Sequence, residues 1–405
     1  MNETKWIWQT KAWPQLRYDQ QAVSSAVFRA RLAEAKLVGK AEAIGFAEMA
    51  ISQRHIWTDD AIATAAIEGE QLNIDVVRSS VARRLGLTND HSPQVSRNVE
   101  GLLDAMEDAT ARSDSDLSHD RLCLWQAGLF QGDAYAMLKG VAIGQYRARA
   151  APLQIISGPV GKETVHYEAP PSAAVRAEMN QLIDWFNRTR RAPSDGNGVP
   201  ENALDGIVRA GLAHLWFEVI HPFEDGNGRV GRVIIDMALA QDAKPPNLPL
   251  PYRLHGVSRE LHRRHAEYYA ALNAASRGDG EVSAWLLWFI DVFATSCDNV
   301  ARLIDESLAR ARFWSDHREV ALNDRQRKAL NKMLEAGPAQ FEGGMTARKY
   351  VALTGVSPIT ATRDLTELFE RGLLLRKGDG RSTYYNLSLD GWGWMPTPRA
   401  NKIAP

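Results

Sequence analysis

The stretch HPFEDGNGRVGR, from His221 to Arg232, holds one imidazole, two adjacent carboxylates, three glycines, an asparagine and two arginines. The apolar segments AGLAHLWFEVI and VIIDMALA precede and follow it, so we expect a loop that joins two buried helices. Glycine lets backbone amides approach an anion closely, and a helix that begins after the loop adds unpaired N–H groups and the positive end of its dipole. The stretch therefore predicts a phosphate-binding loop with a base beside it.

Two side chains of this loop have the chemistry of group transfer. His221 has an ordinary pKa of about 6.5 and can take a proton from a hydroxyl at neutral pH. Asp225 offers the hard oxygen that Mg²⁺ prefers, and this ion commonly bridges one carboxylate to substrate phosphates. The pair predicts a general base close to a divalent ion.

The rest of the loop is suited to holding phosphates. Gly226, Asn227 and Gly228 can present main-chain N–H groups, and the Asn227 amide is expected to add a further donor. Arg229 and Arg232 are three residues apart, on one face of the following helix, where they can grip further phosphates in bidentate fashion. A base, a divalent ion, an anion nest and an arginine clamp together predict transfer from a nucleoside triphosphate to a hydroxyl.

Length and composition place this loop in a globular protein of several domains. The 405 residues are 45% hydrophobic and 24% charged, so two or three domains are expected. The net charge of −1 argues against a surface given over entirely to nucleic acid or anionic membrane, but allows a local basic patch.

Cys123 and Cys297 are expected to be buried free thiols. The N-terminus lacks a signal-peptide layout, and the most apolar stretch is short and contains Asp291, so we expect a cytoplasmic protein without membrane spans.

Upstream, the segment TDDAIATAAIEGEQLNID is predicted to contain a short helix. Thr58 resembles an N-cap followed by two acidic first-turn residues, and Gly69 stands where the helix would close. Thr64 and Glu68 then share one face at i and i+4. Taken alone, Glu68 is most simply a solvated glutamate at a helix end.

One β-hairpin is expected in an otherwise helical region. The segment PLQIISGPVGKETVHY alternates apolar residues on both sides of a turn formed by Gly158, Pro159 and Gly161, between about residues 153 and 166. A lone hairpin needs something to lie against, so we expect a flap over a cleft.

The composition changes from about Arg318 onward. Three short helices and a hairpin are predicted, in the order of a winged helix-turn-helix. Arg363 falls on the predicted recognition helix, and Arg376, Lys377 and Arg381 surround the wing tip. Many winged helices bind only proteins, so DNA and protein partners both remain open.

The central stretch resembles the Fic family motif, H-x-F-x-(D/E)-G-N-G-R-x-x-R, at every specified position. The hairpin segment looks like the Fic hairpin that docks a target, and EYYAAL at 267–272 resembles the adenine-side helix. The opening WIWQTKAWPQL resembles a helical domain often found ahead of Fic cores. The resemblance covers about residues 1–295, and a C-terminal winged helix is a known type of appendage.

This resemblance implies a Mg²⁺-dependent protein adenylyltransferase that transfers AMP from ATP to a Ser, Thr or Tyr hydroxyl of a target protein, or of itself, and releases pyrophosphate. By position, His221 is the base, Asp225 the Mg²⁺ ligand and Phe223 the apolar anchor of the loop. The anion hole and ATP-binding residues are Gly226, Asn227, Gly228, Arg229 and Arg232, with the arginines on the β- and γ-phosphates.

Further implied roles concern the nucleotide. Tyr268, Tyr269 and Leu272 are the expected adenine-side residues. Relatives that transfer phosphate have lysine in place of the second glycine, so the retained Gly228 favours AMP transfer.

The same resemblance changes the interpretation of Glu68. Residues Thr64, Glu68 and Gly69 match the family's inhibitory motif, (S/T)-x-x-x-E-(G/N). A glutamate that reaches Arg232 would form a bidentate pair where the γ-phosphate should bind and would exclude a productive ATP pose. Glu68 is therefore expected to be inhibitory. As in some relatives, it could also orient water for removal of AMP.

The expected fold is mainly α: a Fic-type helical core with a β-hairpin flap, an N-terminal helical domain and a C-terminal winged helix-turn-helix. A homodimer is possible. The alternative function is a DNA-binding transcriptional regulator whose Fic-like core senses ATP. The expected domains are an N-terminal helical domain at 1–90 with its inhibitory helix at about 58–70, a catalytic core at 91–300, a helical linker at 301–317, a winged helix at 318–390 and a tail at 391–405.

Overall fold

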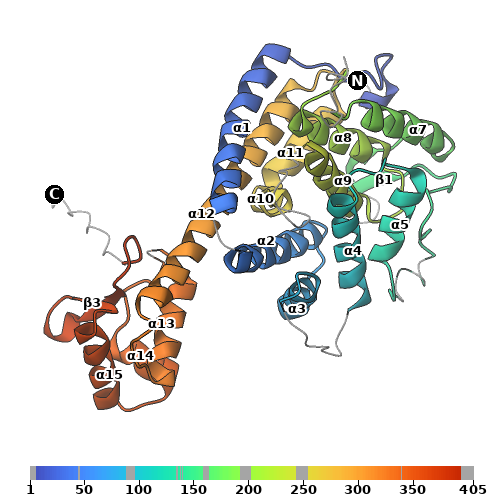
Figure 1. Cartoon of the computed structure of the whole chain (residues 1–405). Coiled ribbons are helices and arrows are strands. Elements are labelled where there is room, and N and C mark those ends of the chain that lie inside the picture. Colours follow the sequence, from blue (N-terminus) through green and yellow to red (C-terminus); the bar gives the residue numbers. More distant parts are fainter. Residues whose placement is uncertain are drawn as a thin grey trace, which may run out of the picture. The chain divides into compact units, whose positions relative to one another are not determined.

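The computed structural model is mainly helical, as expected, with two small antiparallel hairpins among the residues that it describes (Figure 1). It describes residues 6–43, 46–87, 96–133, 136, 138, 140–157, 164–191, 202–242, 254–338 and 340–393. The chain divides into two compact units, Met1–Ala301 and Arg302–Pro405.

Two helices form the centre of the first unit. Every residue of α8 (Gly206–Ile220) is buried, as the unbroken apolar pattern before His221 predicts. The chain turns at the motif and returns as α9 (Asn227–Asp242), which packs closely against α8. Around them lie α4 (Arg97–Ala111), α5 (His119–Leu129) and α7 (Ser172–Arg188), all in contact with this pair or with each other. The central loop is thus the connection between two buried helices.

The N-terminal segment supplies further helices. A short 3-10 helix, η1 (Ile7–Gln9), is followed by α1 (Gln20–Ala43), α2 (Phe46–Ile67) and α3 (Ile74–Arg84). The expected N-cap at Thr58 is wrong, because α2 runs through that position without a break and Thr58 is buried. The tertiary environment overrides the local capping signal there. The predicted end of the helix is confirmed, since α2 stops at Ile67 and Gly69 has a positive φ of 77°.

The predicted hairpin is present. Strand β1 (Gln154–Ser157) pairs antiparallel with β2 (Thr164–Glu168), with an irregularity between Ile155 and Ile156. The predicted turn residues, Gly158, Pro159 and Gly161, lie outside the described residues.

Beyond the motif, the segment from Val257 to Ser276 forms two helices. Helix α10 (Val257–Arg263) ends and α11 (His265–Ser276) begins at Arg264, whose φ of −104° and ψ of 32° depart from helical values. Helix α12 (Ser283–Asp316) follows and places Trp285 against α8, where its ring nitrogen donates to the Gly211 carbonyl at 2.9 Å.

The second unit has the order of elements that the sequence predicts. Helices α13 (Asp324–Ala336), α14 (Ala347–Thr354) and α15 (Pro358–Glu370) precede the strands β3 (Leu374–Lys377) and β4 (Tyr384–Leu387). Their apolar faces enclose one core, and an isolated bridge joins Met345 to Tyr385. Whether this unit acts as a winged helix stays a prediction.

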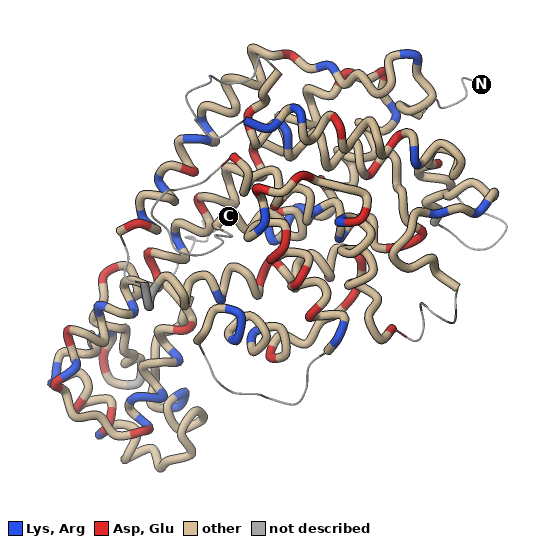
Figure 2. Tube along the Cα trace, turned by 45° about the vertical axis from the view of Figure 1, so that its right-hand side comes forward, with Lys and Arg blue, Asp and Glu red and all other residues tan. Residues whose placement is uncertain are grey.

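Charge in the second unit is mixed. Arg363 is exposed on α15, and Arg376 and Lys377 are exposed on β3; the side chain of Arg381 lies outside the described residues. Figure 2 shows acidic residues interspersed with the basic ones along this unit. DNA binding therefore stays a prediction.

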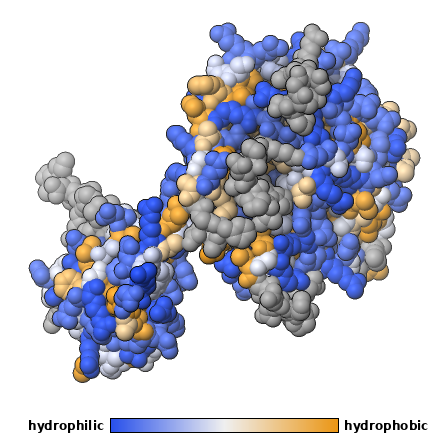
Figure 3. Space-filling model, in the orientation of Figure 1, coloured by the Kyte–Doolittle hydropathy of each residue, from blue (hydrophilic) through white to orange (hydrophobic). Residues whose placement is uncertain are grey.

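Within the described residues, every helix is too short or too polar to cross a membrane. The face of the molecule in Figure 3 is mostly hydrophilic, with separate apolar patches. Cys297 is a buried free thiol, as expected, whereas Cys123 is a free thiol that is only partly buried, so the expectation that it is buried is wrong.

The contact between α4 and α5 gives a test of the packing. A methyl group added at Gly101 would lie 1.9 Å from the Gly128 carbonyl oxygen, a backbone atom that cannot rotate away. We expect Gly101→Ala to lower the melting temperature, because overpacking of this kind costs about 1–3 kcal/mol. Gly39→Ala is the matched control: it adds a methyl group in open space on α1 and should leave the melting temperature unchanged or raise it. Equal melting temperatures for the two variants would contradict the packing.

Candidate active site

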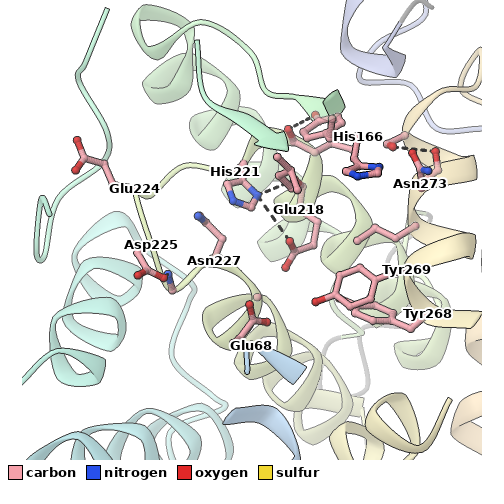
Figure 4. A pocket seen from close by; sticks show the side chains of 17 residues that line it. Glu68, His166, Glu218, His221, Glu224, Asp225, Asn227, Tyr268, Tyr269 and Asn273 are labelled. Carbon is pink, nitrogen blue, oxygen red and sulfur yellow. Dashed lines mark hydrogen bonds and ion pairs between the residues drawn. The ribbon is translucent and has the colours of Figure 1, made fainter. Parts of the chain in front are cut away.

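A cavity of about 500 Å³ lies where α2, α8, α9, α11 and the β1–β2 hairpin meet (Figure 4). Its walls include the motif residues from His221 to Gly228 that face it, together with Glu68, Tyr268 and Leu272. Segments far apart in the sequence therefore form one site. The hairpin contributes Ile155 and His166 to the wall, which fits the expected flap over a cleft.

Phe223 and Asn227 fix the shape of the loop. Phe223 is fully buried against Tyr146 and Phe217, as expected for an apolar anchor. The Asn227 side chain accepts a hydrogen bond from the Phe223 backbone N–H and donates one to its carbonyl, both at 2.8 Å. One N–H of the Asn227 amide and its oxygen are thus used within the loop, and the expected donation of its other N–H to a phosphate stays a prediction.

His221 ends α8 in the left-handed conformation, with φ 49°, which few non-glycine residues adopt. Arg147 holds this turn: its Nε donates to the His221 carbonyl at 2.8 Å, and its Nη2 donates to the Ile220 and Pro170 carbonyls at 3.2 and 2.6 Å. Burial, with a contribution from the Arg147 charge, lowers the pKa of His221 to about 4, although a backbone hydrogen bond and Glu68 oppose this. The imidazole is thus neutral at pH 7, the form that a general base requires.

Arg232 is the most buried charge of the motif, with 1% of its side chain exposed. Its Nε donates to the Thr64 hydroxyl, and its Nη2 donates to the Thr64 carbonyl at 2.8 Å and to Glu68 Oε1 at 2.7 Å. The predicted contact between Glu68 and Arg232 is therefore present, but the expected bidentate geometry is wrong: Glu68 accepts from Nη2 alone, and Thr64 takes the other hydrogen bonds through its hydroxyl and its carbonyl.

The Glu68 carboxylate also lies against the glycines of the loop. A Cβ at Gly228 would be 2.1 Å from Glu68 Oε1, so the missing side chain at this position leaves the space that the carboxylate fills. Burial opposes ionisation of Glu68, but Arg232, Arg229 and His221 outweigh it and lower its pKa. An ionised carboxylate of the chain itself thus lies beside the proposed anion hole.

Arg229, the other motif arginine, has a carboxylate partner that the sequence did not reveal. Its Nη1 donates to Glu70 Oε2 at 2.9 Å, and the Asn98 amide donates to the other oxygen of Glu70 at 3.0 Å. The guanidinium also lies over the Phe130 ring, 5.1 Å from its centroid. Both motif arginines are therefore held by glutamates of one short segment, residues 68–70.

The three expected adenine-side residues all line the cavity. Tyr268 is almost fully buried, and its hydroxyl is 2.8 Å from Nε2 of His214. Tyr269 is 42% exposed, and its hydroxyl donates to the Ile67 carbonyl at 3.3 Å. Tyr269 and Leu272 therefore offer an apolar surface on the side of the cavity away from the loop, as Figure 4 shows for Tyr269.

Asp225 fits a metal that arrives with its substrate better than a metal held by the protein alone. Its side chain is 57% exposed at the cavity wall. Among the described residues, no group of three or more His, Cys, Asp or Glu side chains could hold a metal ion. Mg²⁺ commonly takes one carboxylate, several waters and substrate phosphates, and a single exposed carboxylate beside an anion site matches that donor set.

Two segments of the chain match known protein families. Residues 116–239 match the Fic/DOC family, and residues 6–87 match a domain of unknown function, DUF4172. The chain carries a Fic/DOC family domain. The match ends inside α9, so it includes the whole of the His221–Arg232 motif and the hairpin, whereas the Glu68 segment belongs to the DUF4172 match.

Individual relatives cover less of the chain. Protein adenylyltransferase fic-1 of Caenorhabditis elegans is 28% identical over 144 residues, which are 33% of this chain and 24% of the relative. A probable protein adenylyltransferase of Aquifex aeolicus is 27% identical over 112 residues, 28% of this chain and 27% of the relative. The matches thus span about a quarter of each relative. A crystal structure of a Fic family protein from Desulfovibrio desulfuricans aligns with a TM-score of 0.45 at 19% identity and covers 89% of this chain and 95% of that one.

The residues that sequence reasoning missed are partners of the Fic motif rather than members of it. Glu70 is two residues beyond Glu68, but nothing in that spacing shows that it turns toward Arg229. Arg147 and Asn98 are distant in sequence, and their roles depend on packing. Glu218, whose Oε2 lies 3.8 Å from Nδ1 of His221, is one helical turn before it, and this i, i+3 spacing is the one signal that the sequence offers.

The lowered pKa of Glu68 gives a test by stability. A carboxyl group whose pKa is lower in the folded state stabilises that state above its unfolded pKa of about 4.3, and this contribution is lost as the pH falls through the folded value. We expect Glu68→Gln to melt below the wild type at neutral pH, and the gap to close as the pH falls below about 4. Glu319→Gln, at a glutamate whose side chain is 88% exposed, should show no such closing gap. A difference between Glu68→Gln and wild type that does not change with pH would contradict the pairing.

Proposed function

We propose that this chain is an autoinhibited, Mg²⁺-dependent protein adenylyltransferase. It transfers AMP from ATP to a Ser, Thr or Tyr hydroxyl of a target protein, or of itself, and releases pyrophosphate. The observation that carries the proposal is the position of the Glu68 carboxylate, 2.7 Å from Arg232 and against Gly228. A site that binds its own carboxylate between a glycine loop and a buried arginine has the charge and shape to bind a phosphate.

The chain's own residues account for the proton and the phosphates. The neutral His221 imidazole takes the proton of the target hydroxyl, whose oxygen forms a bond to the α-phosphorus of ATP. The bond from the α-phosphorus to the bridging oxygen of the β-phosphate breaks, and pyrophosphate leaves with that electron pair. Backbone N–H groups from Gly226 to Gly228 stabilise the charge on the oxygens, and Arg229 and Arg232 hold the outer phosphates.

Asp225 is the residue that would hold Mg²⁺. When bound, the ion neutralises phosphate charge and orients the leaving group.

Inhibition in this proposal is competition between two anions for Arg232. Glu68 occupies the position that a terminal phosphate of ATP would take, so ATP cannot adopt a productive pose until the carboxylate leaves. A charge-assisted hydrogen bond of this kind contributes about 1.5–3 kcal/mol. Its loss corresponds to a change of roughly 10- to 100-fold in the population able to react.

We therefore expect Glu68→Gly to raise incorporation of label from α-labelled ATP into protein by roughly 10- to 100-fold. Added His221→Ala should abolish that incorporation. The measurement is labelling of a host lysate and of the chain itself in the presence of Mg²⁺. Labelling of the double variant at the level of Glu68→Gly would show that His221 is not the base.

The same reaction with γ-labelled ATP separates AMP transfer from phosphate transfer. AMP transfer leaves the protein unlabelled by the γ-phosphate, whereas phosphate transfer labels it. Labelling by the γ-phosphate alone would exclude the proposed activity.

The pair between Glu70 and Arg229 predicts a second, weaker inhibitory contact. Glu70→Gln removes the negative charge that pairs with Arg229 but keeps nearly the same side-chain shape. Because Glu70 is partly exposed, with 32% of its side chain accessible, we expect only about a two- to fivefold decrease in the KM for ATP, measured in the Glu68→Gly background. Glu107→Gln is the matched control, since it takes a carboxylate from Arg84 outside the cavity. An increase in KM would show instead that Glu70 aligns Arg229 for the phosphate.

A further inference from the structure

Glu218 is a buried carboxyl group that the proposed mechanism does not yet use. It lies in the last turn of α8, is only 9% exposed and lines the cavity. Its Oε1 has no hydrogen-bond partner among the described residues. Burial of a carboxyl group without full hydrogen bonding is costly, so the presence of Glu218 beside the cavity calls for a role.

The group that Glu218 faces is the proposed base. Nδ1 of His221 is 3.4 Å from the Glu218 carbonyl oxygen and 3.8 Å from its Oε2 (Figure 4). Both acceptors lie on the Nδ1 side of the ring. A proton on Nδ1 can be shared between them, which leaves Nε2 as the nitrogen able to accept a proton.

The charged and titratable groups around Glu218 come from several elements. Glu68 reaches it from the end of α2, Arg232 from α9 and Tyr268 from α11, and His214 lies on α8 itself. Burial and then the charge of Glu68 raise the pKa of Glu218 to about 8, against the opposing effect of Arg232. When Glu68 withdraws, one cause of this rise is removed, and the negative form of Glu218 becomes easier to reach.

We propose that Glu218 is a positioning residue for His221: its carbonyl and carboxyl groups hold the Nδ1–H tautomer and stabilise the imidazolium that forms during the reaction. This inference rests on the proposed function, because it assigns a role beside the same base. In the transfer step the target O–H proton moves to Nε2 while Nδ1 keeps its own proton. The oxygen–phosphorus bond forms, the bond to pyrophosphate breaks, and the new positive charge lies next to the Glu218 carboxyl group, whose negative form it favours.

The test uses the full chain with Glu68→Gly as the parent and Glu218→Gln as the variant. We expect kcat for AMP transfer to fall by roughly 10- to 100-fold, with the KM for ATP changed by less than about threefold, because the carboxylate acts on the base and not on ATP. An ¹⁵N NMR titration of the histidine side chains, without nucleotide, should show a lower pKa for the His221 imidazolium in the variant than in the parent.

Two further variants separate positioning from general damage to the fold. Glu218→Asp keeps the charge and should recover part of the His221 pKa and of kcat. Glu260→Gln changes another buried glutamate, on α10, and should leave the His221 titration unmoved. The proposal is overturned if the His221 pKa is the same in parent and Glu218→Gln, or if Glu260→Gln moves it equally. If the parent itself transfers no AMP, the proposed function fails, but the NMR comparison still decides the pairing of Glu218 with His221.

Discussion

The structure of the site depends on the charge of Arg232, which is almost completely removed from water. An unpaired guanidinium in such a place costs several kcal/mol, so the fold must supply acceptors for it. It does so from a segment more than 160 residues away, through the Thr64 hydroxyl and carbonyl and the Glu68 carboxylate. The buried arginine therefore attaches the end of α2 to α9, and the cavity takes its shape from that attachment.

On the α8 side of the cavity, burial and hydrogen bonds hold the motif loop in place. All residues of α8 are buried, and the loop that follows is closed by Asn227 on Phe223 and by Arg147 on His221. The loop backbone is thus held by hydrogen bonds from the chain itself. The segment 68–70 is tied to the end of α2 by backbone hydrogen bonds to the Ala65 and Ala66 carbonyls, and its side chains make polar contacts with Arg232, Arg229 and Asn98. On the proposed function, the contacts with the two arginines are the ones that phosphates would replace.

The parts of the fold and the site that the sequence predicts are mainly those set by residues close together in the chain. The helices on each side of the motif follow from residue patterns within a few positions. The anchor role of Phe223 and the approach of Glu68 to Arg232 come only from the resemblance to the Fic family, since the local pattern around Glu68 favours a solvated glutamate at a helix end. The predicted N-cap at Thr58 was wrong because the longer helix α2 continues through this local capping signal. The Asn227 amide closes the loop on the Phe223 backbone, a contact that no count of polar groups reveals. Glu70, Arg147 and Glu218 act through neighbours brought together only by tertiary packing.

On the proposed function, relief of inhibition is an exchange of one anion for another. Arg232 cannot be left bare, so Glu68 leaves readily only when a phosphate replaces it, and the apparent affinity for ATP is reduced by the fraction of molecules whose segment is already open. Tyr269 donates to the carbonyl of Ile67, the last residue of α2, while lining the expected adenine side of the cavity. An adenine ring placed against Tyr269 would disturb that contact just as the phosphates displace Glu68. The two ends of one nucleotide would then act on neighbouring residues, Ile67 and Glu68, which makes ATP itself part of what opens the site.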